Sequence, residues 1–180
     1  MKTFLRELAI TLGLALVIFL IFQTMAQNFI VMEQCMEPGF HEGERLLVNK
    51  IAYHFGDPKR GDVIILHPPS NLKSVFIKRI IALPGDTVEV KEGAVYVNGT
   101  KLNETYIKEP IDYTLSVRKI PENEYFVLGD NRNIANDSHR GWTLPRENIV
   151  GKAWFSFWPP DEWGLVDNYP LAEQLASSAE

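Results

Sequence analysis

The chain begins with one long apolar segment. No charged residue occurs in Leu8–Met32, and the most apolar part is Leu8–Phe22. An α-helix needs about twenty residues to cross a bilayer, so residues 7–28 are predicted to form a transmembrane anchor. The second half of the uncharged stretch is more polar, which places the expected end of the helix within Met25–Asn28. Residues 1–6 are then a short cytoplasmic N-terminus.

The charges on either side of the anchor predict its orientation. Lys2 and Arg6 precede the apolar segment, whereas Glu33 and Glu37 follow it. This bias favours a cytoplasmic N-terminus and an external domain. The alternative is a cleaved signal peptide, because residues 24–26 (Thr-Met-Ala) have the small-x-small pattern of a cleavage site. The apolar core exceeds that of a usual signal peptide, which favours the anchor.

After the anchor, the pattern changes to short apolar or alternating runs bounded by glycine and proline, which is typical of strands. Asn98-Gly99 is a strong signal for a two-residue hairpin turn. No helix longer than about two turns is expected here. The expected strands lie at residues 44–50, 62–66, 75–82, 87–91, 94–97, 125–128 and 149–158. We therefore predict one mainly β domain at 29–165, followed by a C-terminal tail at 166–180 that frays after Leu171.

Composition excludes several classes of protein. The 180 residues carry a net charge of −5, so a general affinity for nucleic acid is not expected. The single cysteine excludes an intramolecular disulfide and leaves a free thiol. No group of histidine, cysteine or acidic residues has the spacing of metal ligands, so we expect no metal and no cofactor.

Three segments carry the candidate chemistry. They are Gln34-Cys35-Met36-Glu37-Pro38-Gly39, then Phe76-Ile77-Lys78-Arg79 with Leu83-Pro84-Gly85-Asp86, and finally Gly129-Asp130-Asn131-Arg132 running to Asp137-Ser138-His139-Arg140-Gly141. In this order and spacing they resemble the type I signal peptidases, membrane-bound Ser–Lys proteases that remove signal peptides from exported proteins. The resemblance covers nearly the whole chain.

The resemblance implies a fold and a function. The fold would be an antiparallel β domain of coiled sheets after one transmembrane helix, with a variable β insertion at about 99–120. The partners would be the lipid bilayer and exported preproteins that have small residues at the first and third positions before the cut. The location would be the cytoplasmic membrane, as a single-pass protein with its catalytic domain on the extracytoplasmic side.

The resemblance also assigns residues. Cys35 takes the position of the family's serine nucleophile, and Lys78 takes that of the general base. His139 stands where many members have arginine and is expected to support the site rather than to react. The residues that would shape and brace the site are Met36, Pro38, Arg79, Asp130, Asn131, Arg132 and Asp137.

The chemistry of the pair depends on its surroundings. A free lysine has a pKa of about 10.4 and must lose its proton to act as a base, which burial promotes. Lys78 lies between apolar triplets, although alone it would suit an edge strand as a surface lysine. Cys35 could instead be a small buried apolar residue. A free thiol has a pKa of about 8.5, so if the two groups touch we expect thiolate with ammonium.

The chain departs from the family at four positions. Cys35 replaces the serine and Gly39 the threonine of the nucleophile motif. Glu33 replaces a serine or glycine, and its carboxylate would repel an oxyanion. Ala135 replaces a serine that bonds the lysine. Three alternatives therefore stay open: a slow thiol peptidase, a protein that has lost activity and binds signal peptides or a partner peptidase, and a related protease such as a conjugative-transfer processing enzyme.

Overall fold

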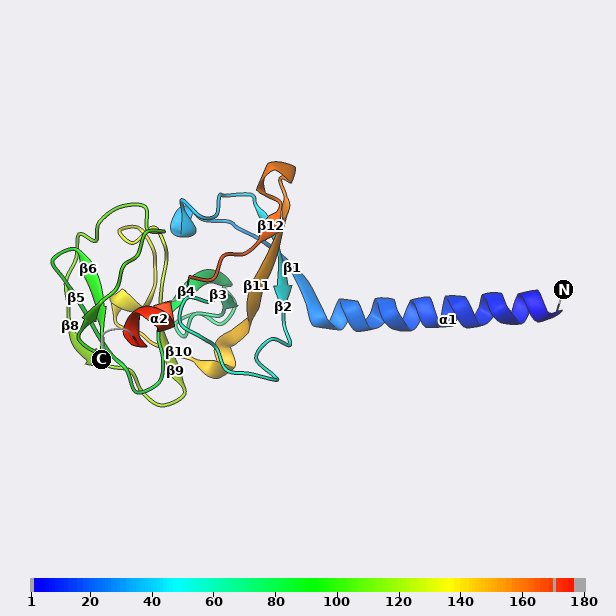
Figure 1. Ribbon diagram of the computed structural model, residues 1–180, viewed down its shortest axis with the longest axis horizontal. Helices are drawn as coiled ribbons and strands as arrows, with labels where there is room; N and C mark the ends of the chain where they lie inside the picture. Colours follow the sequence, from blue (N-terminus) through cyan, green and yellow to red (C-terminus); the bar gives the residue numbers. More distant parts are fainter. Residues whose placement is uncertain (1, 170, 177–180) are drawn as a thin grey trace.

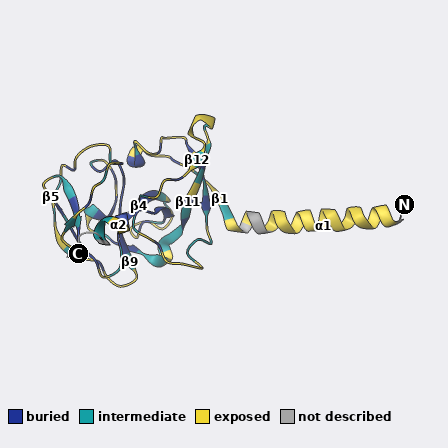
Figure 2. Ribbon diagram, viewed as in Figure 1, coloured by how far each residue is buried: buried dark blue, intermediate teal, exposed yellow. Residues whose placement is uncertain are grey.

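The computed structural model describes residues 2–169 and 171–176, and it consists of a long N-terminal helix followed by a β domain (Figure 1). Helix α1 (Lys2–Met25) contains an 18-residue span, Thr3–Leu20, that is long and apolar enough to cross a membrane. Its described side chains are exposed along its length (Figure 2). Such an apolar surface is consistent with membrane anchoring.

The chain passes from helix to strand without a loop. Strand β1 (Ala26–Ile30) pairs antiparallel with β2 (Arg45–Asn49), and the Lys50 N–H donates a hydrogen bond of 3.0 Å to the Met25 carbonyl. The sequence did not predict β1, because the uncharged run was assigned to the anchor as far as Asn28. The pairing with β2 satisfies the main chain here as well as a helix would, so the polar end of the run joins the sheet.

The larger sheet has eight strands, in the order β1-β2-β11-β3-β4-β9-β10 with β12 paired to β11. Its pairings are all antiparallel. Strand β4 lies inside the sheet between β3 and β9, which decides the environment of its side chains. The remaining strands are β3 (Val63–Leu66), β4 (Phe76–Ala82), β9 (Glu124–Leu128), β10 (Leu144–Pro145), β11 (Ile149–Trp158) and β12 (Gly164–Leu165).

The smaller sheet has the order β7-β6-β5-β8 and is also antiparallel. Its strands are β5 (Thr87–Lys91), β6 (Ala94–Val97), β7 (Thr100–Lys101) and β8 (Leu115–Lys119). The predicted turn between β6 and β7 is present, with positive φ at both Asn98 (51°) and Gly99 (81°). Two successive residues with positive φ are what a tight two-residue hairpin requires.

Short helical turns complete the fold. They are η1 (Gln34–Met36), η2 (Ser138–Arg140), η3 (Arg146–Asn148), η4 (Pro160–Glu162) and α2 (Leu171–Ala176). The tail was expected to fray after Leu171. This is wrong for the residues up to 176, which form α2. Leu171 is fully buried in the apolar cluster of the smaller sheet, and this burial holds α2 against the domain. Residues 177–180 lie outside the described residues.

The mainly β fold with one apolar N-terminal helix is confirmed. Each of the seven predicted strands is present to within one residue at either end. The missed strands are β1, β7, β8, β10 and β12. Three of these, β7, β10 and β12, are only two residues long, which is too short for an alternating pattern to be visible.

Candidate active site

The fold brings Cys35 and Lys78 together. Lys78 lies in the middle of β4, and Cys35 lies in η1, the single turn that follows Glu33. The Lys78 Nζ is 3.0 Å from the Cys35 Sγ and donates a hydrogen bond of 2.9 Å to the Ile77 carbonyl. Lys78 is completely buried. Cys35 and Lys78 are therefore in contact, and the alternative of a surface lysine on an edge strand is wrong because β4 is an inner strand.

The surroundings of the pair are mostly apolar. The Lys78 Nζ lies 5.1 Å from the centre of the Phe76 ring, and the Cys35 Sγ lies 3.7 Å from the Ile77 carbonyl oxygen. Ala135 packs in the same buried cluster as Cys35 and offers only a methyl group. The Ile77 carbonyl is thus a polar group of the main chain that orients the amine in this protein.

Burial decides the charge state of the thiol. Desolvation raises the pKa of the Cys35 thiol above its ordinary value, and Lys78 opposes this only in part, while the charges of Glu33 and Asp137 raise it further. The raised pKa disfavours the thiolate paired with an ammonium that the sequence led us to expect. A buried site disfavours the charged form of the sulfur, so the nucleophile needs a base to take its proton.

The raised pKa makes a measurable prediction about alkylation. Only the thiolate reacts with iodoacetamide. We expect Cys35 in the folded protein to react more slowly at pH 7 than in the denatured chain, and its rate to keep rising with pH beyond the usual thiol pKa of about 8.5. The measurement is the alkylation rate from pH 6 to 11, with the denatured chain as control. A folded-state rate that levels off below pH 8 would contradict the raised pKa.

The Gly129–Arg132 segment holds the turn that carries Cys35. The Asn131 N–H donates to the Cys35 carbonyl at 3.0 Å, and the Asn131 side-chain amide donates to the Gln34 carbonyl at 3.1 Å. Glycine is required at 129, since a Cβ there would lie 2.5 Å from the Cys35 carbonyl oxygen. The Gly129 N–H donates in turn to the Asp137 carboxylate at 2.9 Å. These contacts fix the position of Cys35.

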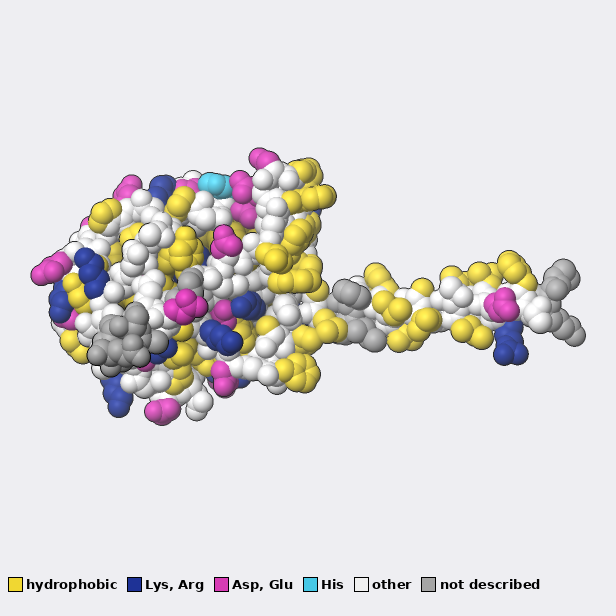
Figure 3. All heavy atoms as spheres, viewed as in Figure 1, with side chains coloured by type: hydrophobic (Ala, Val, Ile, Leu, Met, Phe, Trp, Pro, Cys, Tyr) yellow, Lys and Arg dark blue, Asp and Glu magenta, His cyan; other side chains and the backbone are white. Residues whose placement is uncertain are grey.

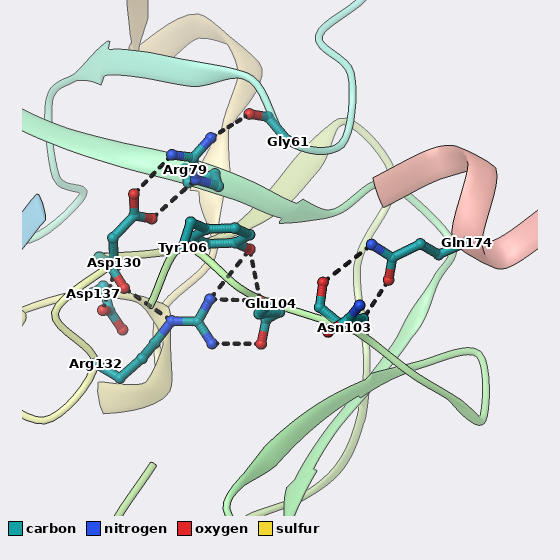
Figure 4. Close-up of polar contacts among 10 residues, drawn as sticks. Gly61, Arg79, Asn103, Glu104, Tyr106, Asp130, Arg132, Asp137 and Gln174 are labelled. Carbon is teal, nitrogen blue, oxygen red and sulfur yellow. Dashed lines mark hydrogen bonds and ion pairs between the residues drawn. The ribbon is translucent and has the colours of Figure 1, made fainter. Parts of the chain in front are cut away.

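Two buried ion pairs lie behind this segment (Figure 4). The Arg79 guanidinium donates to both Asp130 oxygens at 2.9 and 2.7 Å, and to the Gly61 carbonyl at 2.9 Å. The Arg132 guanidinium binds both Glu104 oxygens and also donates to the Gly129 carbonyl at 2.9 Å. Planar two-point pairs of this kind fix orientation as well as charge. The Arg79–Asp130 pair connects β4 to the Gly129–Arg132 segment, and the Arg132–Glu104 pair connects that segment to residue 104.

Sequence reasoning missed the contribution of residues 99–120. Glu104 is the partner of Arg132, and the Tyr106 ring lies 4.4 Å from the Arg79 guanidinium carbon. Lys108 forms an ion pair of 2.6 Å with Glu37, beside the nucleophile turn. This stretch has no periodic pattern, so nothing local in the sequence indicated that it braces the site.

The other predicted site residues have distinct surroundings. Met36, the last residue of η1, is fully buried, whereas Pro38 is exposed and follows a cis peptide bond. A Cβ at Gly39 would lie 3.7 Å from an Asp130 oxygen, which is ordinary contact. His139 donates its main-chain N–H to Asp137 at 3.1 Å, and its ring Nδ1 lies 2.6 Å from the same oxygen. His139 therefore supports Asp137 and does not reach the Cys35–Lys78 pair.

The arrangement can perform nucleophilic chemistry on an amide. A thiol lies against an amine, and no hydrogen bond engages the Cys35 main-chain N–H in the part of the chain that the structure describes. That N–H could donate to a developing oxyanion. A cavity of about 40 Å³ adjoins Cys35. Among the described residues no group of three or more histidine, cysteine or acidic side chains could hold a metal ion.

Comparison with known proteins gives a consistent result. Residues 3–158 match the family model described as "Signal peptidase, peptidase S26". "Probable signal peptidase I-1" of Synechocystis sp. is 42% identical over 92% of this chain and 89% of its own length. "Signal peptidase I" of Leptolyngbya laminosa is 43% identical, over 89% and 83% respectively. A solved signal peptidase I from Enterococcus faecalis aligns at 31% identity and a TM-score of 0.49, over 53% of this chain and 96% of that one.

Proposed function

Since the chain belongs to the signal peptidase family, we propose that it cleaves signal peptides from exported preproteins with Cys35 as nucleophile and Lys78 as base. The function of the chain is that of a signal peptidase I, a peptidase hydrolase. The observation that supports the assignment of Cys35 and Lys78 is their contact of 3.0 Å inside the domain. Both side chains come from the two segments that carry the family's nucleophile and base.

The proposed reaction has two stages. The Lys78 amine takes the thiol proton as the Cys35 sulfur attacks the carbonyl carbon, and the Cys35 N–H donates to the oxygen that becomes negative. The lysine then gives that proton to the leaving amine, which releases the mature protein and leaves a thioester on Cys35. In the second stage Lys78 takes a proton from the water that attacks the thioester, the C–S bond breaks, and the departing Cys35 sulfur regains that proton from Lys78. The signal peptide leaves with a free carboxyl group, which then ionises.

The raised thiol pKa explains why Lys78 matters in this scheme. A protonated thiol is a poor nucleophile, so removal of its proton is part of the barrier. The Ile77 carbonyl accepts a hydrogen bond from the Lys78 amine and so orients that amine towards the sulfur. In the family a serine hydroxyl bonds this lysine, and here Ala135 stands in its place. We infer that the replacement of serine by cysteine makes the protein slow rather than inactive.

We also propose that α1 anchors the protein in the cytoplasmic membrane and that the β domain lies on its outer side. Lys2 and Arg6 at the start of α1 support a cytoplasmic N-terminus. Apolar side chains gather at the edge of the domain from which α1 extends (Figure 3). The exposed large apolar residues of β11, β12 and the turn between them are Trp154, Trp158, Trp163 and Leu165. Tryptophan is enriched at membrane surfaces, which supports contact with the lipid bilayer there.

A preprotein cleavage assay with the full chain in detergent tests the proposed function. Substrates should carry alanine at the first and third positions before the cut, since the 40 Å³ cavity beside Cys35 suits a small side chain. We expect cleavage that alkylation of Cys35 abolishes. The matched control is Cys35→Ser, whose activity, whatever its size, should be insensitive to the alkylating reagent.

Two outcomes would overturn the proposal in different ways. Fast cleavage that alkylation leaves unchanged would remove Cys35 from the reaction. Binding of the signal peptide without cleavage would instead favour a protein that binds signal peptides. The raised thiol pKa and the nearby Glu33 charge favour this second candidate function, because both oppose formation of an anion at the site.

A further inference from the structure

Glu33 introduces a charge beside an apolar cavity. The cavity of about 40 Å³ is the one that contains Cys35, and two larger cavities of about 700 and 380 Å³ include neither Cys35 nor Lys78. Its other lining residues are Phe29, Met32, Val75, Phe76 and Ile77. Glu33 is thus the charged side chain in the lining of this cavity beside Cys35.

The Glu33 carboxylate has no partner of its own within the described residues. Glu33 precedes η1 in an extended conformation (φ −135°, ψ 155°), and its side chain does not cap that turn. Neither an ion pair nor a hydrogen bond of its side chain is found in residues 2–169 and 171–176, and the residue is exposed. By contrast, Glu37 on the other side of Cys35 is paired with Lys108. Glu33 is therefore available to a group that enters the site.

Its charge acts on the reaction centre. Glu33 stands two residues before Cys35, and its carboxylate is one of the charges that disfavour an anion on the sulfur. Attack on an amide creates a second anion, the oxygen of the tetrahedral intermediate, and a nearby carboxylate destabilises it. A positive side chain placed next to Glu33 would reduce this repulsion. Among the described residues no basic side chain pairs with Glu33, so the substrate is the group that can supply one.

We propose that Glu33 is a specificity-determining residue that selects preproteins with lysine or arginine immediately after the cut. This inference rests on the proposed function and specifies its substrate class. The small apolar side chain before the cut fills the 40 Å³ cavity, and the chain then continues past Glu33 on the rim. A basic residue at the next position pairs with the carboxylate, both on binding and as the oxyanion forms. An acidic residue at that position meets like charge and is rejected.

The test compares three synthetic signal peptides that differ only in the residue after the cut, which is lysine, glutamine or glutamate. With the full chain in detergent, we expect kcat/KM to fall by about two- to fivefold at each step from lysine to glutamine to glutamate, the upper part of the range for an exposed charge pair. Glu33→Gln should bring the three values to within about twofold, and Glu33→Lys should reverse their order. Added salt should weaken the preference of the native protein.

The control variant is Glu42→Gln, which removes an exposed carboxylate outside the cavity and should leave the order of the three substrates unchanged. A residue with a merely structural role would alter all three rates alike, and no substitution of it would reverse their order. Equal kcat/KM for the three peptides in the native protein would overturn the inference.

Failure of the proposed function gives a separate result. If the native protein cleaves none of the peptides, their dissociation constants can be measured by the change in tryptophan fluorescence. Tighter binding of the lysine peptide than of the glutamate peptide, abolished in Glu33→Gln, would support the role of Glu33 in a protein that only binds. Equal affinities in the native protein would overturn that role as well.

Discussion

Replacing Lys78 with methionine should reduce kcat/KM for a signal-peptide substrate by about 10²–10⁴, the usual contribution of a general base. Methionine has a similar length and no charge, so it can fill the buried space inside the larger sheet. The change removes the group that lies 3.0 Å from the sulfur and leaves the protonated thiol without a base. The measurement is the steady-state rate at pH 7, with circular dichroism to show that the fold is retained.

A control variant and the pH dependence of the loss test whether the effect is specific to Lys78. Lys73→Met changes an exposed lysine in the loop before β4 and should leave the rate unchanged. The loss in Lys78→Met should become smaller as the pH rises towards the raised pKa of Cys35, because hydroxide then takes over removal of the thiol proton. A Lys78→Met variant that keeps a tenth or more of the native rate would remove Lys78 from the mechanism.

Replacing Asp130 with alanine should lower the free energy of unfolding by about 3–5 kcal/mol. Asp130 is completely buried and accepts two hydrogen bonds from Arg79, which is itself only 2% exposed. Without the carboxylate, the guanidinium stays buried with its charge uncompensated, and this costs far more than the loss of an exposed pair. The measurement is guanidinium-induced unfolding of the full chain in detergent, followed by tryptophan fluorescence.

The matched controls separate burial from charge. Glu89→Ala removes the carboxylate of a solvent-exposed pair with Lys91 and should leave the unfolding midpoint essentially unchanged. The double variant Arg79→Met, Asp130→Leu should lose less stability than Asp130→Ala, since it leaves no unpaired charge. A loss below about 1 kcal/mol in Asp130→Ala would show that the pair is not needed for stability.

Much of the fold could be predicted because the strands carry their own signals. Thr87–Lys91 alternates along its length, and its observed burial alternates in the same way. The run of apolar residues around Lys78 predicted a strand, and its near-continuous burial follows from the position of β4 inside the sheet. The contact of Cys35 with Lys78 could be predicted only through the resemblance to a family, because the two residues are 43 positions apart.

Other features depend on tertiary context and left no local signal. Ion pairs such as Arg132–Glu104 join residues whose types are common on surfaces, so the sequence alone does not show that they are buried together. The raised pKa of Cys35 was not foreseen, because the reference pKa values of free side chains do not include desolvation. Strand β1 was missed because its pairing with β2 depends on residues about twenty positions further along.

The direct junction between α1 and β1 restricts how the domain that carries Cys35 can move relative to the helix. The helix ends at Met25, the strand starts at Ala26, and the hydrogen bond from Lys50 joins the last residue of the helix to the sheet. No loop therefore lies between α1 and the sheet that leads to Cys35. With α1 spanning the membrane as we propose, this junction would hold the Cys35 sulfur at a set height above the bilayer surface. A preprotein would then have to bring its scissile bond to that height, so the number of residues between the apolar core of a signal peptide and its cut would become a criterion for cleavage.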